Sequence, residues 1–332
     1  MSTPPLSTPL KPAVPAPRWK SRWKSRNAAP YLFIAPFFLL FVVFGVFPLL
    51  FSIFLSLHQW DPAAGLSAMR WVGLDNYVYA ITDPWFQQSL YNTLWFALVS
   101  GLPQHLVALP LAYFINLRLK RSRNLFVGAY FVPYITSSVA IALVFSTLLS
   151  TDYGIINALL AELTRMPLLG SLVPVEPVDW LNNATYTKPA VAFVVFWRYL
   201  GWNLVLYLSA LQVIDKEMYE AATLDGASTW KQFRYITLPL LKPMIFFAVT
   251  LTIIGNLQLF EEPFILVDIE KGVAHSVMTT AIFMYRMAFS DGDFGTASAV
   301  SWLLFFVIAL LTWLNSRLFG RDALQGGSHA NR

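Results

Sequence analysis

Long runs of apolar residues, separated by short polar segments, dominate the sequence from residue 31 onward. A helix needs about 20 apolar residues to cross a hydrocarbon core about 30 Å thick. None of these runs alternates between apolar and polar positions as the strands of a membrane barrel do, and each is longer than such a strand. The pattern therefore predicts six membrane-spanning helices, over residues 31–57, 93–117, 125–149, 189–211, 238–260 and 296–319.

The composition agrees with a protein whose surface faces lipid. Hydrophobic residues make up 57% of the 332 positions and charged residues 12%, against about 25% charged residues in ordinary soluble domains. This charge density cannot cover a water-facing surface of that size, which argues against a soluble enzyme. The chain has no cysteine, so disulfides, thiolate metal sites and cysteine nucleophiles are excluded.

Basic residues are concentrated on alternate sides of the predicted spans. Residues 1–30 contain six basic and no acidic residues, and residues 118–123 contain four basic and no acidic residues. The other three connections, 58–90, 150–187 and 261–293, contain more acidic than basic residues. Because loops on the cytoplasmic side are enriched in Lys and Arg, this asymmetry predicts that both termini lie in the cytoplasm.

The predicted spans form one domain, residues 31–320, between two tails. Residues 1–30 are rich in proline and serine and are predicted to be a disordered, basic cytoplasmic tail, and residues 321–332 a second cytoplasmic tail. Within the first tail, the motif Arg18-Trp-Lys-Ser is repeated at Arg22. We interpret it as a segment that lies on anionic lipid headgroups, with docking to a partner protein as the alternative.

Motifs of nucleotide, metal and acyl-transfer chemistry are missing from the sequence. It contains no G-x-x-x-x-G-K-[ST] phosphate loop, no H-E-x-x-H and no G-x-S-x-G. The four histidines are scattered without the spacing of metal ligands. We therefore predict no catalytic residue, no cofactor and no metal site in this chain. If transport uses the energy of a nucleotide, another polypeptide must bind it.

The most informative polar segment is residues 215–239, between the fourth and fifth predicted spans. Asp215 is a favourable N-cap, and the ten residues after it are mostly good helix formers. Gly226 stands where this helix is expected to stop, and Pro239 fits the first turn of the fifth span. Such a helix–turn–helix would act as a rigid lever outside the membrane. The plainer alternative is a loop that folds on the headgroups.

One face of the helix predicted in this segment is shallow. Met218, Ala221, Ala222 and Asp225 follow the spacing i, i+3, i+4, i+7 and therefore share a face. At the two alanines the backbone or side chains of another protein could approach closely. The pattern fits a docking surface on such a lever, with a loop that merely folds on the headgroups as the alternative.

The same segment resembles a known motif. Glu220-Ala-Ala, then Gly226, then Ile236-x-Leu238-Pro239 is similar to the EAA loop of bacterial ATP-binding cassette (ABC) importer permeases, with every fixed position at its offset. Where that family often has Gly-Gly-Pro after the fifth span, this chain has Glu-Lys-Gly at 270–272. Further stretches resemble the sugar-importer branch, which includes the maltose and glycerol-3-phosphate permeases: Trp-Val-Gly-Leu-Asp-Asn-Tyr at 71–77, Asn-Thr at 92–93, Phe-Val-Pro at 131–133, Trp-Leu at 180–181, Ala-Leu-Gln at 210–212, Leu-Pro-Leu-Leu-Lys-Pro at 238–243 and Phe-Gly-Thr-Ala-Ser-Ala at 294–299.

The resemblance implies an all-α integral membrane protein with the type I permease fold of ABC importers, in the bacterial inner membrane. It implies three kinds of partner: a second, homologous permease that completes the translocation path as a heterodimer, two cytoplasmic ATPases, and an extracytoplasmic binding protein that delivers a sugar. No nucleic acid is expected to bind. The residues that it assigns to coupling with the ATPase are Glu220, Ala221, Ala222, Asp225, Gly226, Leu238 and Pro239.

Polar residues inside the predicted spans are costly in a membrane and are candidates for the substrate path. Arg198 lies near the middle of the fourth span and is expected to face a cavity or a partner group. Gln104 and His105 are expected to serve packing. Aromatic faces, amides and a charged group are the groups that bind sugars, and hydrogen bonds between helices are the alternative role. The candidates are Arg198, Tyr199, Trp202, Asn203, Asn256 and Gln258.

A secondary transporter driven by protons or sodium is the alternative function. Such proteins usually contain internal repeats and broken helices in paired positions. The sequence has no evident internal repeat and no chain of carboxylates within the spans. An intramembrane enzyme is a third possibility, but no paired catalytic residues lie within the spans. A single basic residue in the candidate path favours a neutral sugar over a sugar phosphate.

Overall fold

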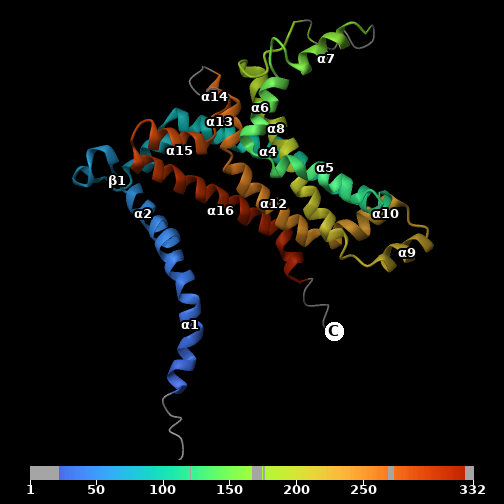
Figure 1. Cartoon of the computed structure of the whole chain (residues 1–332), viewed down its shortest axis with the longest axis horizontal. Helices are drawn as coiled ribbons and strands as arrows, with labels where there is room; N and C mark the ends of the chain where they lie inside the picture. The colour runs from blue at the N-terminus through green and yellow to red at the C-terminus, as the bar shows by residue number, and fades with distance from the viewer. Residues whose placement is uncertain (1–21, 120, 167–173, 175, 268–272, 326–332) are drawn as a thin grey trace, which may run out of the picture. The chain divides into compact units, whose positions relative to one another are not determined.

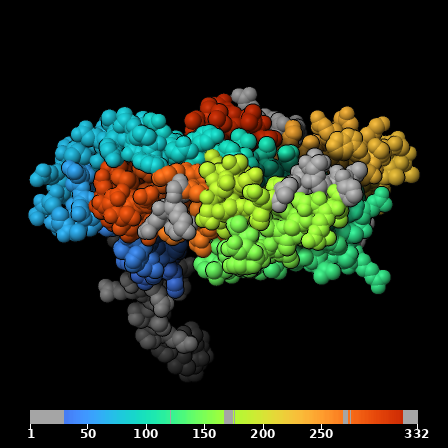
Figure 2. All heavy atoms as spheres, turned by 90° about the horizontal axis from the view of Figure 1, so that it is seen from above, coloured from blue at the N-terminus to red at the C-terminus, as the bar shows by residue number. Residues whose placement is uncertain are grey.

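The structure is a computed structural model, and it describes residues 22–119, 121–166, 174, 176–267 and 273–325. The chain forms two compact units, Met1–Phe54 and Leu55–Arg332, and each is considered by itself. Figures 1 and 2 show the course of the chain by colour.

The described part of the first unit is one long helix. It comprises α1 (Arg22–Phe41), a π-helical turn at Val42–Val46, and α2 (Phe47–Ser56), whose last two residues belong to the second unit. The stretch Pro30–Ser56 is long and apolar enough to cross a membrane, as predicted. The helix begins at Arg22, so residues 22–30, which we expected to be disordered, are helical. Residues 1–21 lie outside the described part of the chain.

At one end of the second unit, a two-stranded antiparallel hairpin and a short helix follow α2. The hairpin pairs β1 (His58–Gln59) with β2 (Arg70–Trp71), and α3 (Asp75–Thr82) comes next. The side-chain amide of Asn76 donates hydrogen bonds of 3.0 and 2.9 Å to the backbone carbonyls of Ser56 and His58. This buried amide fixes the hairpin against α3.

Four predicted spans are confirmed as long apolar helices of the second unit. The carboxylate of Asp83 caps the first of them by accepting from the backbone N–H of Trp85 and Phe86. The side chains of Ser100, Ala108 and Ala112 on that helix are buried, and small residues let membrane helices approach closely. The helices are α4 (Pro84–Arg118), α8 (Ala184–Leu211), α12 (Lys242–Leu257) with α13 (Glu261–Leu266), and α16 (Phe294–Gln325).

The third predicted span is broken, which corrects the expectation of a continuous helix over residues 125–149. It consists of α5 (Arg123–Ile135) and α6 (Ser138–Leu148), which meet at 97°. Between them, Thr136 has an extended backbone, and Ser137, with φ = −54° and ψ = 134°, is not helical either. The hydroxyl of Thr136 donates to the carbonyl of Val132 at 2.7 Å, and such side-chain bonds compete with the helical ladder.

The remaining elements are short. In the second unit, α9 and α10 lie at the end opposite to β1 and α3 (Figures 1 and 2). The helix α16 continues to Gln325, beyond the boundary at residue 320 that the sequence pattern predicts. The short elements are α7 (Ile155–Thr164), α9 (Lys216–Leu224), α10 (Thr229–Gln232), a π-helical turn (Phe233–Thr237), α11 (Leu238–Leu240), α14 (Ala274–Val277) and α15 (Thr280–Phe289).

Candidate functional site

The segment 215–239 folds as the helix–turn–helix that its sequence predicts. The carboxylate of Asp215 accepts from the backbone N–H of Glu217 at 3.2 Å and caps α9. Gly226 has φ = +77°, a conformation that residues other than glycine rarely adopt. Around it, the N–H of Ala227 donates to the carbonyl of Ala222 at 2.8 Å, and the N–H of Gly226 to that of Thr223 at 3.0 Å. These two bonds form a Schellman motif, which ends the helix at this point.

Side-chain hydrogen bonds attach this helix–turn–helix to the long helices. The hydroxyls of Tyr219 and Thr237 lie 2.8 Å apart, and burial raises the pKa of Tyr219, so its hydroxyl stays protonated at neutral pH. The amide of Gln232 donates to the hydroxyl of Thr223 at 2.9 Å and joins α10 to α9. The hydroxyl of Tyr113 on α4 donates to the carbonyl of Thr229. These hydrogen bonds make the segment 215–239 an ordered helix–turn–helix.

The face of α9 that carries Met218, Ala221 and Asp225 is exposed, whereas Ala222 is half-buried. Leu224 is also exposed, at 90%. Glu220, by contrast, lies with Lys216 and Tyr219 on the opposite side of α9, where the three line a cavity. Leu238 is half-buried and Pro239 exposed, both in α11. The candidate coupling residues thus belong to one segment but not to one face.

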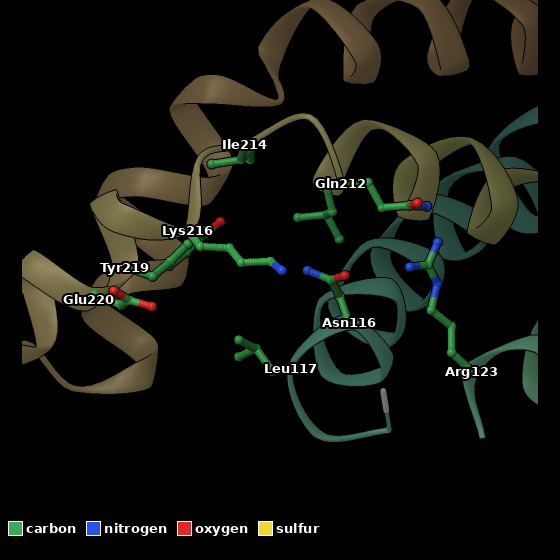
Figure 3. Close-up of a pocket in the computed structure, with 9 residues that line it drawn as sticks. Asn116, Leu117, Arg123, Gln212, Ile214, Lys216, Tyr219 and Glu220 are labelled. Carbon is green, nitrogen blue, oxygen red and sulfur yellow. The ribbon is translucent and has the colours of Figure 1, made fainter. Parts of the chain in front are cut away.

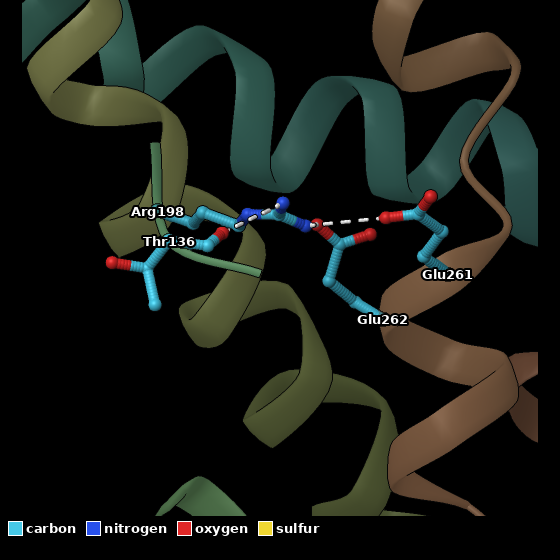
Figure 4. Close-up of polar contacts among 4 residues, drawn as sticks. All are labelled: Thr136, Arg198, Glu261 and Glu262. Carbon is cyan, nitrogen blue, oxygen red and sulfur yellow. Dashed lines mark hydrogen bonds and ion pairs between the residues drawn. The ribbon is translucent and has the colours of Figure 1, made fainter. Parts of the chain in front are cut away.

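Arg198 has its charged partner within the same chain (Figure 4). Its Nη1 lies 2.6 Å from Oε1 of Glu262 and 3.7 Å from a carboxylate oxygen of Glu261, both on α13. Its Nη2 donates to the carbonyl of Thr136, at the break between α5 and α6. The side chains of Arg198 and Glu262 are 10% and 3% exposed. This buried ion pair holds α8, α13 and the broken span together.

Tyr199 and Trp202 form an aromatic cluster with α5. The ring of Tyr134 lies 4.8 Å from that of Trp202 in a stacked arrangement and 5.9 Å from that of Tyr199. The guanidinium of Arg198 lies 5.5 Å from the ring of Tyr199. Three of the six path candidates are therefore brought together, beside the broken span.

Asn203 and Asn256 are buried and bind α4 instead. Asn203 donates to the side-chain oxygen of Gln104 at 3.1 Å, and Asn256 donates to the hydroxyl of Ser100 at 3.3 Å, one turn away on the same helix. The imidazole of His105 lies 2.7 Å from the hydroxyl of a buried tyrosine on α8. Gln104 and His105 thus contact α8 through hydrogen bonds, which is compatible with the packing role expected for them.

Gln258 is separate from the other candidates. It is exposed at the C-cap of α12 and lines a cavity of about 810 Å³ between α12, α15 and α16. The walls of this cavity are mostly apolar and aromatic, with Phe260, Tyr285 and Phe305 among them, and Ser298 adds a hydroxyl. A side-chain amide among aromatic rings supplies two kinds of group that bind sugars, a hydrogen-bonding group and aromatic faces.

Two site residues carry no distinctive sequence signal. Glu262 was recognisable only as an acidic residue at the outer end of the fifth span, because 64 residues separate it from Arg198. Tyr134 looked like one of many aromatic residues of a span. Among the described residues, no group of three or more His, Asp or Glu side chains could hold a metal ion.

Residues 106–320 match the protein family described as binding-protein-dependent transport system inner membrane component. The chain belongs to this family. The arabinooligosaccharides transport system permease protein AraP of Bacillus subtilis is 31% identical over 313 residues, which cover 94% of this chain and 95% of AraP. The lactose transport system permease protein LacF of Rhizobium radiobacter is 34% identical over 285 residues, which cover 86% of this chain and 91% of LacF.

A solved structure has the same fold as this permease. It is the crystal structure of a bacterial ABC transporter involved in the import of the acidic polysaccharide alginate, with a TM-score of 0.75 at 23% identity over 90% of this chain and 98% of that one. Family and fold make this protein a multi-pass permease of the inner membrane. Permease subunits of this family are not enzymes, since ATP hydrolysis belongs to a separate subunit.

Proposed function

We propose that this permease forms half of the translocation path of an ATP-driven importer for a neutral mono- or oligosaccharide. The observation that carries the proposal is the EAA-type segment, which is folded as a helix–turn–helix bonded to α4 and to the π-helical turn before α12. Its exposed face on α9 is available to a partner. The relatives named for arabinooligosaccharide, lactose and trehalose/maltose transport support a sugar as the cargo.

The proposed partners follow from an importer in which permease subunits form the path and separate subunits hydrolyse ATP. Two cytoplasmic ATPases would receive α9 of this chain and its counterpart in a second, homologous permease, and an extracytoplasmic binding protein would deliver the sugar. Closure of the ATPases would move the face with Met218, Ala221 and Asp225. Gly226 and the bond between Tyr219 and Thr237 would pass this movement to α12. Glu220 would contribute a charged hydrogen bond within the loop or to the ATPase.

The charges of the candidate path favour a neutral cargo. Arg198 is the basic residue among the six candidates, and Glu262 already neutralises it at 2.6 Å. A phosphorylated or acidic sugar would need an unpaired cation. We propose that Tyr199, Trp202 and Gln258 contact the sugar through aromatic faces and an amide, whereas Asn203 and Asn256 hold the helices in place.

The test is uptake in cells that lack the gene. Labelled lactose, trehalose, maltose and arabinooligosaccharides are offered to the deletion strain and to the strain that carries a wild-type copy. We expect uptake of at least one neutral sugar to be lost on deletion and restored by the copy. We also expect this uptake to stop when ATP is depleted and to continue when an uncoupler removes the proton gradient.

Two results would refute the proposal. Uptake of every neutral sugar at the wild-type rate in the deletion strain would refute the cargo. Uptake that stops with the uncoupler while ATP remains high would favour the ion-coupled transporter instead.

A further inference from the structure

A second cavity, of about 480 Å³, lies between α9 and the neighbouring ends of three other helices (Figure 3). We call it the α9 cavity. One wall comes from the end of α4, a second from the start of α5, a third from the end of α8, and the last from α9. Its lining residues are Asn116, Leu117, Arg123, Leu211, Gln212, Ile214, Lys216, Tyr219 and Glu220.

Two basic side chains line this cavity, on either side of Asn116. In Figure 3 the amine of Lys216 points toward the amide of Asn116, and the guanidinium of Arg123 extends beside the amide of Gln212 on the far side. The Nε of Arg123 is buried and has no hydrogen-bond partner among the described residues. Neither cation forms an ion pair with an acidic side chain in that part of the chain. These cations and amides are hydrogen-bond donors that lack an anionic acceptor.

The cavity lies where the apolar parts of α4 and α8 end. Leu117, Leu211 and Ile214 form an apolar side next to the polar one. The charge asymmetry places this end of the spans at the cytoplasmic headgroups, where phospholipids present a phosphate above an apolar glycerol–acyl region. Basic pockets between membrane helices on this side bind anionic headgroups.

We propose that the α9 cavity binds the phosphate of an anionic phospholipid such as phosphatidylglycerol. Arg123 and Lys216 hold the phosphate, and the amide of Asn116 donates to a remaining oxygen. The amide nitrogen of Gln212 already donates to the carbonyl of Leu208 at 3.1 Å, so it has one N–H left for the phosphate. The carboxylate of Glu220 repels a phosphate, but it accepts hydrogen bonds from the hydroxyls of a glycerol headgroup. This combination favours phosphatidylglycerol over phosphatidic acid.

An acidic side chain of the ATPase is a poorer occupant. Lys216, Tyr219 and Glu220 lie on one side of α9, whereas Met218, Ala221 and Asp225 lie on the other. Lys216 and Glu220 are exposed as well, but the cavity that they line with Tyr219 lies against the ends of α4, α5 and α8, at the level of the lipid headgroups. The lipid site goes beyond the proposed transport function, because it makes α9 a contact point for the membrane as well as for the ATPase.

The test is lipid binding by the purified full-length chain in neutral detergent. Phosphatidylglycerol or phosphatidylcholine with the same acyl chains is titrated into the sample, and native mass spectrometry counts the lipids that the protein retains. We expect one tight phosphatidylglycerol site and no matching phosphatidylcholine site. Arg123→Gln and Lys216→Gln should each weaken the binding about five-fold, the usual effect of one basic residue at an anionic membrane surface.

The matched control is the double variant Arg118→Gln with Arg121→Gln. Both residues are exposed in the same basic loop and neither lines the cavity, so phosphatidylglycerol affinity should not change. Thermal unfolding of each variant without added lipid verifies folding. If Arg123→Gln does not fold, Lys216→Gln alone decides the test.

Three results would overturn the proposal. The first is equal affinity for the two lipids, and the second is an equal loss of affinity in the control and in the cavity variants. The third is displacement of phosphatidylglycerol by millimolar inorganic phosphate, which would identify free phosphate as the ligand. None of these measurements involves sugar, ATP or the partner subunits. Failure of the lipid site would therefore leave the proposed transport function untouched.

Discussion

At the scale of single residues, Arg198 shows how this permease keeps a charge inside the membrane. An unpaired arginine at the centre of a span costs about 2.5–3.5 kcal/mol on insertion scales. In this protein a carboxylate oxygen of Glu262 lies 2.6 Å from the guanidinium of Arg198, and both side chains are buried. The pair therefore contributes mainly to the position of α13 against α8, because removal of Arg198 would leave Glu262 as an unpaired buried charge.

We predict that Arg198→Gln destabilises the protein by about 3–5 kcal/mol, the usual cost of leaving a buried partner charge. The double variant Arg198→Leu with Glu262→Leu should recover most of this loss, since it removes both charges. Thermal unfolding of the purified chain in micelles measures the effect. Arg165→Gln is the control, because its pair with Glu162 is largely exposed and such pairs contribute about 0–1 kcal/mol. Equal losses in Arg198→Gln and Arg165→Gln would contradict the interpretation.

Gln258 and Asn203 should respond differently to replacement by alanine. Gln258 is exposed in the larger cavity, so Gln258→Ala should lower sugar uptake while the amount of assembled complex stays unchanged. Asn203 is buried and bonded to Gln104, so Asn203→Ala should cost about 1–3 kcal/mol of stability, because the partner amide is left unsatisfied. Uptake assays and complex yield are measured together. Normal transport by the assembled fraction of Gln258→Ala would remove this residue from the sugar path.

At the scale of elements, close packing of α5 on α8 supports the broken span. Gly201 on α8 faces the backbone of α5 so closely that an added Cβ would lie 1.7 Å from the carbonyl oxygen of Tyr130. Only glycine fits at such a contact. The aromatic cluster of Tyr134 and Trp202 lies at this same interface, and the separation of the two helices therefore determines its geometry.

Gly201→Ala is expected to push α5 away from α8 and to destabilise the protein by about 1–3 kcal/mol, the usual cost of overpacking. Gly128→Ala on α5 is the matched control, because nothing lies within 4 Å of its added Cβ. Thermal unfolding in micelles compares the two. The packing argument fails if Gly201→Ala is as stable as Gly128→Ala.

For the helix–turn–helix at residues 215–239, we predict that Gly226→Val uncouples ATP hydrolysis from uptake. No atom lies within 4 Å of an added Cβ there, so the cost is backbone strain at φ = +77°, about 1–3 kcal/mol. Asn tolerates this conformation better than Val, and Gly226→Asn should retain more activity. Membrane insertion should be normal in both, because the residue lies outside the spans. Sugar-stimulated hydrolysis in proteoliposomes that contain the whole importer measures coupling.

Ala221→Trp tests the exposed face of the same element. The bulky ring should hold the ATPase away from α9, so we expect weaker co-purification of the ATPase. Normal co-purification and normal sugar-stimulated hydrolysis in both Ala221→Trp and Gly226→Val would show that this segment is not the coupling element.

At the scale of the whole molecule, the distribution of charge and the family together describe a multi-pass inner-membrane permease. In the part of the chain that the structure describes, five helices are long and apolar enough to cross a membrane, and the bent pair α5–α6 accounts for a sixth crossing if it is one span. An even number of crossings leaves both termini on the same side. The basic segments then select the cytoplasm for that side.

Reporter fusions test this topology. Fusions after residues 75, 170 and 275 should report the outside, and fusions after residues 121 and 226 the cytoplasm, because the basic residues are concentrated in the second group of segments. Alkaline phosphatase and a fluorescent protein report the two compartments. A fusion after residue 170 that reports the cytoplasm would show that α5 and α6 form a re-entrant loop and not a span.

The sequence by itself determined the features that depend on neighbouring residues. A span requires only enough apolar residues in a row, and orientation requires only a count of basic residues in the connecting segments. The same holds for α9, because Asp215 caps it and Gly226 ends it through bonds to residues at most five positions away. These parts of the fold and of the helix–turn–helix at residues 215–239 were therefore predictable in detail.

Only the tertiary structure decided which distant residues meet. Arg198 pairs with Glu262 across 64 positions, and the six path candidates divide between α5, α4 and the larger cavity. The 97° bend between α5 and α6 likewise has no periodic signature in the sequence. The physical reason is that such contacts depend on the angles and distances at which helices pack. These are determined by side chains on several helices at once, and no local pattern of apolar and polar residues contains them.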